Sequence, residues 1–323
     1  MTQALPDGSE LGARLREHDL SAAPAVLNVL ENRTPGAREE ADALLAAIST
    51  RALGAEAPGH VVGVTGPPGV GKSSLLSRLA ADWRSRGRTV AILAVDPTSK
   101  RSGGALLGDR ARMEVDPSDP GVFIRSTAAG DRVGGLAPAT RAAAAALSVA
   151  FDVVVIETVG VGQSETDVAE VADTVAVVVQ PGSGDVLQFL KAGIMEIPDV
   201  LVVTKADLGR IAQRAAADLV SSLGALGSED TPVVPVSSLA PPRGIAELVE
   251  ALDSHRERLD LPARRLQARR MHALADFAAE HGERGLRALG GRRAAERLLT
   301  EEDPALDVPS LLEALERGAA RGG

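Results

Sequence analysis

The chain has 323 residues and 45% apolar side chains, enough for one large core domain with appendages, and a formal net charge of −9 that argues against nucleic acid or an anionic membrane as its main partner. It contains no cysteine, which excludes disulfides, thiolate metal sites and cysteine nucleophiles. Its N-terminus lacks a signal-peptide pattern and no run of about 18 residues is apolar without charge, so we expect a cytoplasmic protein without a transmembrane helix.

The first part of the chain, residues 1–56, carries apolar side chains at helical spacing and no strand signal. We interpret it as an N-terminal helical region that covers the core. In residues 57–260, short runs rich in valine and isoleucine alternate with helical runs, which is typical of a parallel sheet covered by helices on both faces. The predicted fold is therefore α/β with a mainly parallel sheet. Strands are expected at 60–65, 89–95, 122–125, 152–157, 174–180, 199–204 and 232–236.

The last part of the chain, residues 261–323, returns to a helical pattern rich in arginine, alanine and glutamate. The pattern is broken at Gly290-Gly291 and again near Pro304 and Pro309. This segment is too short and polar to hold a large core alone. We therefore expect it to pack on the main domain or on a second subunit.

Residues 66–73 read Gly-Pro-Pro-Gly-Val-Gly-Lys-Ser and match G-x-x-x-x-G-K-[ST], the phosphate-binding loop of P-loop nucleoside triphosphatases. A predicted strand precedes the motif and a helical run follows it, which is the context that the motif requires. Backbone N–H groups of such a loop surround a β-phosphate, Lys72 reaches the β- and γ-phosphates, and the Ser73 hydroxyl ligates Mg²⁺. The predicted phosphate-contacting residues are Gly66, Pro67, Pro68, Gly69, Val70, Gly71, Lys72, Ser73 and Ser74.

Polar residues follow the predicted strands at the carboxyl ends, where ligands of parallel sheets bind. Glu157 ends one strand and is expected to order the Mg²⁺ shell, and Gly160 in the next loop to present its N–H to the γ-phosphate. Asp96 and Asp109 are further Mg²⁺ candidates, although an aspartate at such a place can equally cap a helix or face solvent. Catalytic roles are assigned to Lys72, Glu157, Asp96 and Asp109.

The run Thr204-Lys205-Ala206-Asp207 predicts which base is bound. An aspartate at this position accepts hydrogen bonds from N1–H and the 2-amino group of guanine, whereas adenine offers neither donor. The usual first residue of this motif is asparagine, and we expect the loss of one supporting hydrogen bond at Thr204 to weaken guanine binding by about 0.5–1.5 kcal/mol. Ser237-Ser238 fits the loop that contacts the guanine carbonyl. The expected ligands are GTP, GDP and Mg²⁺.

The sequence leaves the groups that act on the attacking water open. Gln163 can orient a water or simply be a surface side chain. A cis arginine finger can come from Arg101, Arg110 or Arg112, but each arginine can equally be solvated. Without a secure finger, we expect intrinsic turnover on the order of 10⁻³ s⁻¹ or below, which suits a switch better than a metabolic catalyst.

Several segments together resemble one family, the MeaB/ArgK-type GTPases that act as chaperones of adenosylcobalamin-dependent acyl-CoA mutases. The resemblance covers roughly residues 20–260. The two most specific segments are Leu107-Gly108-Asp109-Arg110-Ala111-Arg112-Met113 and Glu157-Thr158-Val159-Gly160-Val161-Gly162-Gln163-Ser164-Glu165. Further matches are Val95-Asp96-Pro97-Thr98-Ser99, Pro181-Gly182-Ser183-Gly184-Asp185, Lys191-Ala192-Gly193-Ile194-Met195-Glu196-Ile197 and Lys205-Ala206-Asp207.

The resemblance implies a homodimeric GTPase that couples nucleotide state to cofactor loading of a mutase and to removal of inactivated cofactor. It implies that residues 261–323 form a dimerisation arm, and that Asp185, Gln188 and Lys191 belong to a switch loop that reports to the mutase. Three alternatives stay open at this point: a nickel metallochaperone GTPase, a kinase acting on a transport-related protein, and a P-loop protein without turnover. The absence of cysteine and of a histidine cluster disfavours the first, and Asp207 disfavours the ATP preference of the second.

Overall fold

The computed structural model describes residues 6–32, 34–96, 113–128, 136–158, 164–182, 198–225 and 227–322. These residues fall into two compact units. The helical unit contains the chain up to Pro58, residues 145–150 and the chain from Asp260 onward. The sheet unit contains residues 59–144 and 151–259. The N-terminal and C-terminal helices, which are far apart in sequence, thus lie in the same unit.

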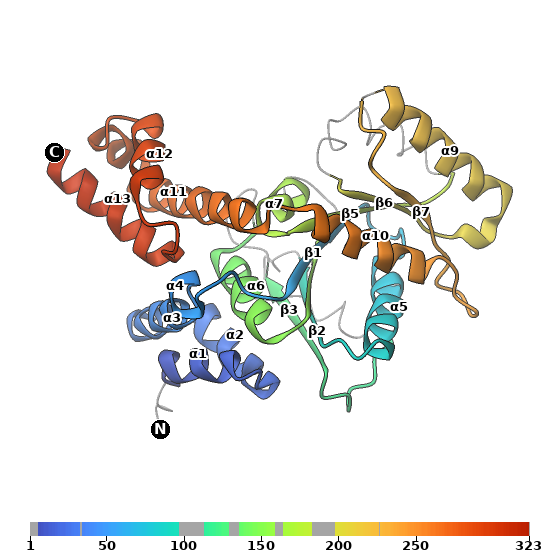
Figure 1. The fold of residues 1–323 in the computed structure, drawn as a ribbon, viewed down its shortest axis with the longest axis horizontal. Coiled ribbons are helices and arrows are strands. Elements are labelled where there is room, and N and C mark those ends of the chain that lie inside the picture. Colours follow the sequence, from blue (N-terminus) through green and yellow to red (C-terminus); the bar gives the residue numbers. More distant parts are fainter. Residues whose placement is uncertain are drawn as a thin grey trace, which may run out of the picture. The chain divides into compact units, whose positions relative to one another are not determined.

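The sheet unit is built on one seven-stranded sheet with the strand order β3-β2-β4-β1-β5-β6-β7, and every pairing is parallel (Figure 1). The strands are β1 (His60–Thr65), β2 (Val90–Asp96), β3 (Val122–Ala128), β4 (Val153–Thr158), β5 (Thr174–Val179), β6 (Val200–Val203) and β7 (Val233–Pro235). All of the strands predicted from the sequence are present. Every residue of β1, β4, β5 and β6 is buried, which explains why their sequences read as continuous apolar runs.

Helices cover both faces of this sheet, as strand alternation requires. The helices of the sheet unit are α5 (Lys72–Ser85), α6 (Pro138–Ala150, of which residues 145–150 belong to the helical unit), α7 (Ser164–Val171), η4 (Ala206–Leu208), α9 (Arg210–Ala225) and α10 (Ile245–Arg258). Val62 and Val64 of β1 share one core cluster with apolar residues of α5 and α10. Gly63 between them faces the other side, where a Cβ would lie 2.6 Å from a methyl of Val168 in α7. The missing side chain lets α7 pack close to β1.

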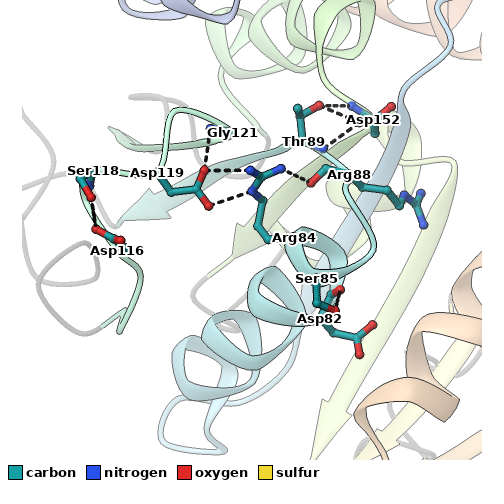
Figure 2. A network of polar contacts seen from close by, with 10 residues as sticks. All are labelled: Asp82, Arg84, Ser85, Arg88, Thr89, Asp116, Ser118, Asp119, Gly121 and Asp152. Carbon is teal, nitrogen blue, oxygen red and sulfur yellow. Dashed lines mark hydrogen bonds and ion pairs between the residues drawn. The ribbon is translucent and has the colours of Figure 1, made fainter.

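A polar network fixes the amino-terminal edge of the sheet, where β2, β3 and β4 begin (Figure 2). The guanidinium of Arg84, at the end of α5, donates to both carboxylate oxygens of Asp119 at 2.8 and 2.9 Å. Asp119 also accepts the N–H of Gly121 at 2.8 Å. Beside it, Asp152 accepts both the N–H and the hydroxyl of Thr89, at 2.7 and 2.8 Å. These contacts fix the starts of the strands, at the edge of the sheet opposite their carboxyl ends.

The helical unit joins the two ends of the chain. Its helices are α1 (Gly8–Arg16), η1 (Leu20–Ala22), α2 (Ala23–Glu31), α3 (Pro35–Ala47), α4 (Thr50–Leu53), α11 (Leu261–Ala288), α12 (Arg292–Glu301) and α13 (Val308–Gly322). The breaks predicted near Gly290-Gly291 and Pro304 are confirmed, since α12 begins at Arg292 and ends at Glu301. The sequence reading missed a kink in α11 at Gly282, whose φ of 60° and ψ of −163° are not helical.

Contacts between α11 and the N-terminal segment hold this unit together. Arg269 donates from both terminal nitrogens to the carboxylate of Glu56, each at 2.9 Å, and Arg265 donates to the carbonyl of Ala57 at 2.6 Å. An apolar core of α11, α12 and α13 packs around Phe277, which is 1% exposed. Among the described residues, no helix combines the length and apolar character that crossing a membrane requires.

Candidate functional site

The loop between β1 and α5 has the backbone shape that the glycine motif predicts. Gly66 has a φ of 145°, and a Cβ there would lie 2.1 Å from the carbonyl oxygen of Val178 in β5. Only glycine lets the chain leave β1 this close to the neighbouring strand. Gly71 has a φ of 100°, and a Cβ there would meet nothing within 4 Å. The loop therefore presses against β5 at its start and is open at its end.

Helix α5 begins directly from this loop. Its N-cap is Gly71, which offers no capping side chain, so the first N–H groups of the helix are available to a ligand. Lys72 is 7% exposed and donates from Nζ to the carbonyls of Gly66 and Pro67, at 2.7 and 3.2 Å. Its ammonium thus lies inside the loop that its own backbone closes. This is the arrangement that an anion bound by the loop would need.

The first residues of α5 lie next to the carboxyl end of β4, the strand that pairs with β1. The Ser73 hydroxyl lies 3.4 Å from Oε1 of Glu157, a residue that is 4% exposed. Strand register explains the meeting, because Glu157 pairs with Val64 of β1, close to the point where the loop begins. A hydroxyl and a carboxylate are both oxygen ligands of the kind that Mg²⁺ prefers. The residues present therefore fit a Mg²⁺ ion at this point.

A second loop, which follows β6, lies beside the first. The Thr204 hydroxyl is buried and lies 2.7 Å from the carbonyl oxygen of Val70 in the glycine loop. From the sequence we expected threonine at this position to lose a supporting hydrogen bond, whereas its hydroxyl donates one to Val70. Lys205 has a φ of 56°, a conformation uncommon for a residue with a side chain, and its ammonium contacts Gln180 Oε1. The chain turns sharply here before it reaches Asp207.

Asp207 is exposed, and one of its two carboxylate oxygens accepts a hydrogen bond. The Ser237 hydroxyl donates to its Oδ1 at 2.8 Å, and the N–H of Ala206 donates to the carbonyl of Val236 at 2.9 Å. Ser237 is 1% exposed, so its hydroxyl is a fixed donor. The second carboxylate oxygen remains available for a ligand's N–H groups. The two predicted base loops, after β6 and after β7, are therefore in direct contact.

Two contributors were not predicted from the sequence. Arg78 of α5 donates from Nε to the carbonyl of Ser238 at 2.9 Å, which ties the helix of the glycine loop to the second base loop. Gln180, at the end of β5, accepts from Lys205. An arginine on a helix and a glutamine after a strand carry no local signal that distinguishes them from surface residues.

The structure thus brings most predicted site residues to one edge of the sheet, at the carboxyl ends of β1, β4, β6 and β7. Ser74 lies in α5 next to Ser73 and is exposed. Asp96 ends β2, but its side chain is not among the described parts of the chain. Several predicted residues lie outside the described residues altogether: Asp109, Gly160, Gln163, Arg101, Arg110, Arg112, Asp185, Gln188 and Lys191.

Known proteins resemble this chain along most of its length. A sequence profile of the family described as "Methylmalonyl Co-A mutase-associated GTPase MeaB" matches residues 8–284. A Pyrococcus abyssi protein named as a GTPase is 41% identical over 81% of this chain and 80% of its own length. A Mycobacterium tuberculosis protein, also named as a GTPase, is 39% identical over 76% of this chain and 74% of its own length.

Two more distant proteins extend the comparison. A Caenorhabditis elegans protein named "Methylmalonic aciduria type A homolog, mitochondrial" is 36% identical over 68% of this chain, which spans 57% of that relative. A crystal structure titled as a LAO/AO transport system kinase superposes with a TM-score of 0.65 at 26% identity, over 98% of this chain and 99% of that one. The match to this solved structure therefore includes residues of both the sheet unit and the helical unit.

Proposed function

Because the chain belongs to the MeaB family of P-loop GTPases, we propose that it is a GTP-driven switch that acts as chaperone of an adenosylcobalamin-dependent acyl-CoA mutase. In this proposal the nucleotide state gates the loading of cofactor and the removal of inactivated cofactor. The family's description names association with methylmalonyl-CoA mutase, and the Caenorhabditis elegans relative carries a methylmalonic aciduria name. Both point to the same class of partner.

The observation that carries the nucleotide part of the proposal is the meeting of the glycine loop with Glu157 and the two base loops at one sheet edge. N–H groups of the loop and the Lys72 ammonium bind the phosphates. Ser73 and Glu157 would hold Mg²⁺, which would neutralise phosphate charge when bound. The chain's own contribution is to hold the phosphates in position. A water then attacks the γ-phosphorus as the bond to the β–γ bridging oxygen breaks, which releases inorganic phosphate and leaves GDP in the site.

Asp207 selects guanine over adenine in this proposal. Its carboxylate accepts N1–H and the 2-amino group of guanine, while Ser237 fixes the carboxylate in place. Sites built to pair a substrate's donors reject analogues without them by up to about 10⁴–10⁵. Asp207→Asn exchanges an acceptor for a donor, and we expect it to lower GTP affinity and to raise affinity for XTP, which carries a carbonyl in place of the amino group. Equilibrium binding of both nucleotides to both proteins checks this.

The mutase part of the proposal is tested by phosphate release. The purified full chain is incubated with GTP or ATP, with and without each adenosylcobalamin-dependent acyl-CoA mutase encoded by the same genome. We expect slow GTP hydrolysis that the cognate mutase stimulates, and no turnover in Lys72→Ala. Lys191→Ala should keep the basal rate and lose the stimulation. ATP preference, or a rate that no acyl-CoA mutase changes, would contradict the proposal.

The same assay separates the alternatives. The solved structure titled as a transport system kinase raises phosphoryl transfer to a protein as a second candidate. Labelled γ-phosphate that appears on a protein rather than in solution would favour that kinase, and release that depends on nickel would favour a metallochaperone. We also propose that the chain forms a homodimer through residues 261–323. Sedimentation equilibrium of the full chain checks this, since a dimer has twice the mass of one chain.

A further inference from the structure

The Thr204 side chain links the loop after β6 to the phosphate loop. The residue is 4% exposed, and its hydroxyl lies 2.7 Å from the carbonyl oxygen of Val70 and 3.0 Å from that of Val179. The backbone N–H of Thr204 already donates to Val179 at 2.9 Å. A hydroxyl carries one proton, and the shorter contact marks Val70 as its main acceptor.

The geometry of the peptide bond gives this contact a consequence. The carbonyl of Val70 and the N–H of Gly71 belong to one planar trans peptide unit, in which the two groups point in opposite directions. A hydroxyl that holds the carbonyl toward β6 therefore turns the N–H of Gly71 to the opposite side of the loop. There is open space beside the loop at Gly71, since a Cβ there would meet nothing within 4 Å.

The base end of the same loop is held by other contacts. Asp207 receives the Ser237 hydroxyl at 2.8 Å, and Ala206 is tied to Val236 by a backbone hydrogen bond at 2.9 Å. None of these contacts involves the Thr204 hydroxyl. The two ends of the segment 204–207 are therefore fixed independently, one against the glycine loop and one against the loop after β7.

We propose that Thr204 is a positioning residue for the phosphate rather than for the base. Its hydroxyl fixes the Val70–Gly71 peptide and so aims the Gly71 N–H at the phosphate that the loop binds. This inference rests on the proposed nucleotide site. It reverses the expectation from the sequence, in which threonine in place of asparagine weakens the recognition of guanine.

The test compares two nucleotides that differ only at the base. IDP lacks the 2-amino group of GDP, so the ratio of their affinities reports how well Asp207 is placed, whereas an equal change in both reports on the phosphate loop. Thr204→Val keeps the shape and removes the donor. We expect it to weaken GDP and IDP by the same factor, about three- to tenfold, with the ratio unchanged. Thr204→Ser, which keeps the hydroxyl, should bind both nucleotides like the wild type.

Matched variants keep the result interpretable. Ser237→Ala releases the Asp207 carboxylate and should lower the GDP-to-IDP ratio, the opposite signature. Thr204→Cys, whose S–H is a weaker donor, serves if the valine variant does not fold, and should show a smaller common loss. Folding of each variant without nucleotide is followed by the fluorescence of Trp83, the single tryptophan, which is 1% exposed in α5.

Either of two results overturns the inference: Thr204→Val lowers the GDP-to-IDP ratio as Ser237→Ala does, or it binds both nucleotides as tightly as the wild type. A failure of the proposed nucleotide site looks different. In that case the wild type does not bind GDP, or Lys72→Ala and Ser237→Ala bind both nucleotides unchanged.

Discussion

Replacing Gly66 by alanine tests the packing of the glycine loop against the sheet. The new Cβ would lie 2.1 Å from the carbonyl oxygen and 3.0 Å from the carbonyl carbon of Val178. Both are backbone atoms of β5 one residue before its end, where Val178 pairs with Val202 of β6. The chain cannot relieve the overlap by a rotamer change. Either the loop moves off the strand or the strand is displaced from its ladder.

The free energy of unfolding should fall through two effects. Backbone strain at a φ of 145° contributes about 1–3 kcal/mol for a residue with a side chain. Steric overlap adds about 1–3 kcal/mol, the usual range for overpacking. The matched control is Gly87→Ala, since Gly87 also has a positive φ, 78°, but a Cβ there would meet nothing within 4 Å. It should lose only about 1–2 kcal/mol.

Urea unfolding followed by Trp83 fluorescence measures the sheet unit, because the helical unit contains no tryptophan. Gly66→Ala should unfold at clearly lower urea than Gly87→Ala. It should also bind GDP more weakly, since the Gly66 carbonyl is one of the groups that hold the Lys72 ammonium. Equal unfolding midpoints for the two variants would refute the steric argument, and so would unchanged GDP affinity in Gly66→Ala.

Two further predictions concern ion pairs. Hydrogen bonds from Arg84 (Figure 2) hold the pKa of Asp119 below its usual value of about 4, so the stabilisation is present above that value and is lost as the pH falls through the lowered pKa. Asp119→Asn should therefore flatten the decline of the Trp83-detected urea midpoint below about pH 4, and an unchanged decline would contradict this. Arg269→Ala removes the ion-pair partner of Glu56, whose side chain is 11% exposed and still accepts from the Thr50 hydroxyl at 3.2 Å. It should destabilise the helical unit by about 3 kcal/mol in circular dichroism melts. Arg317→Ala, at a pair whose arginine side chain is 57% exposed, should change the stability by at most about 0.5 kcal/mol. Equal effects of the two substitutions would show that the first pair is not structural.

The sequence by itself determined the helices and strands of this protein and the place of its glycine loop. The glycine motif at 66–73, the valine-rich runs and the breaks near Gly290 are local patterns, and each structural expectation drawn from them is confirmed. Such patterns suffice because helix and strand periods, turn residues and phosphate-binding loops are encoded within a few neighbouring residues. The kink at Gly282 was not predicted, because a glycine inside a helical run can adopt either a helical or a non-helical conformation.

Tertiary structure decided which of these residues act on one another. The sheet order places β1 between β4 and β5, which brings Ser73 to Glu157 and presses Gly66 against Val178. It also brings Thr204 to Val70, which lie 134 positions apart. No local pattern contains that order, because a strand carries its burial in its sequence but not the identity of its neighbours. For that reason Thr204 read as a weakened base contact in the sequence, and only the folded chain shows its hydroxyl on the phosphate loop.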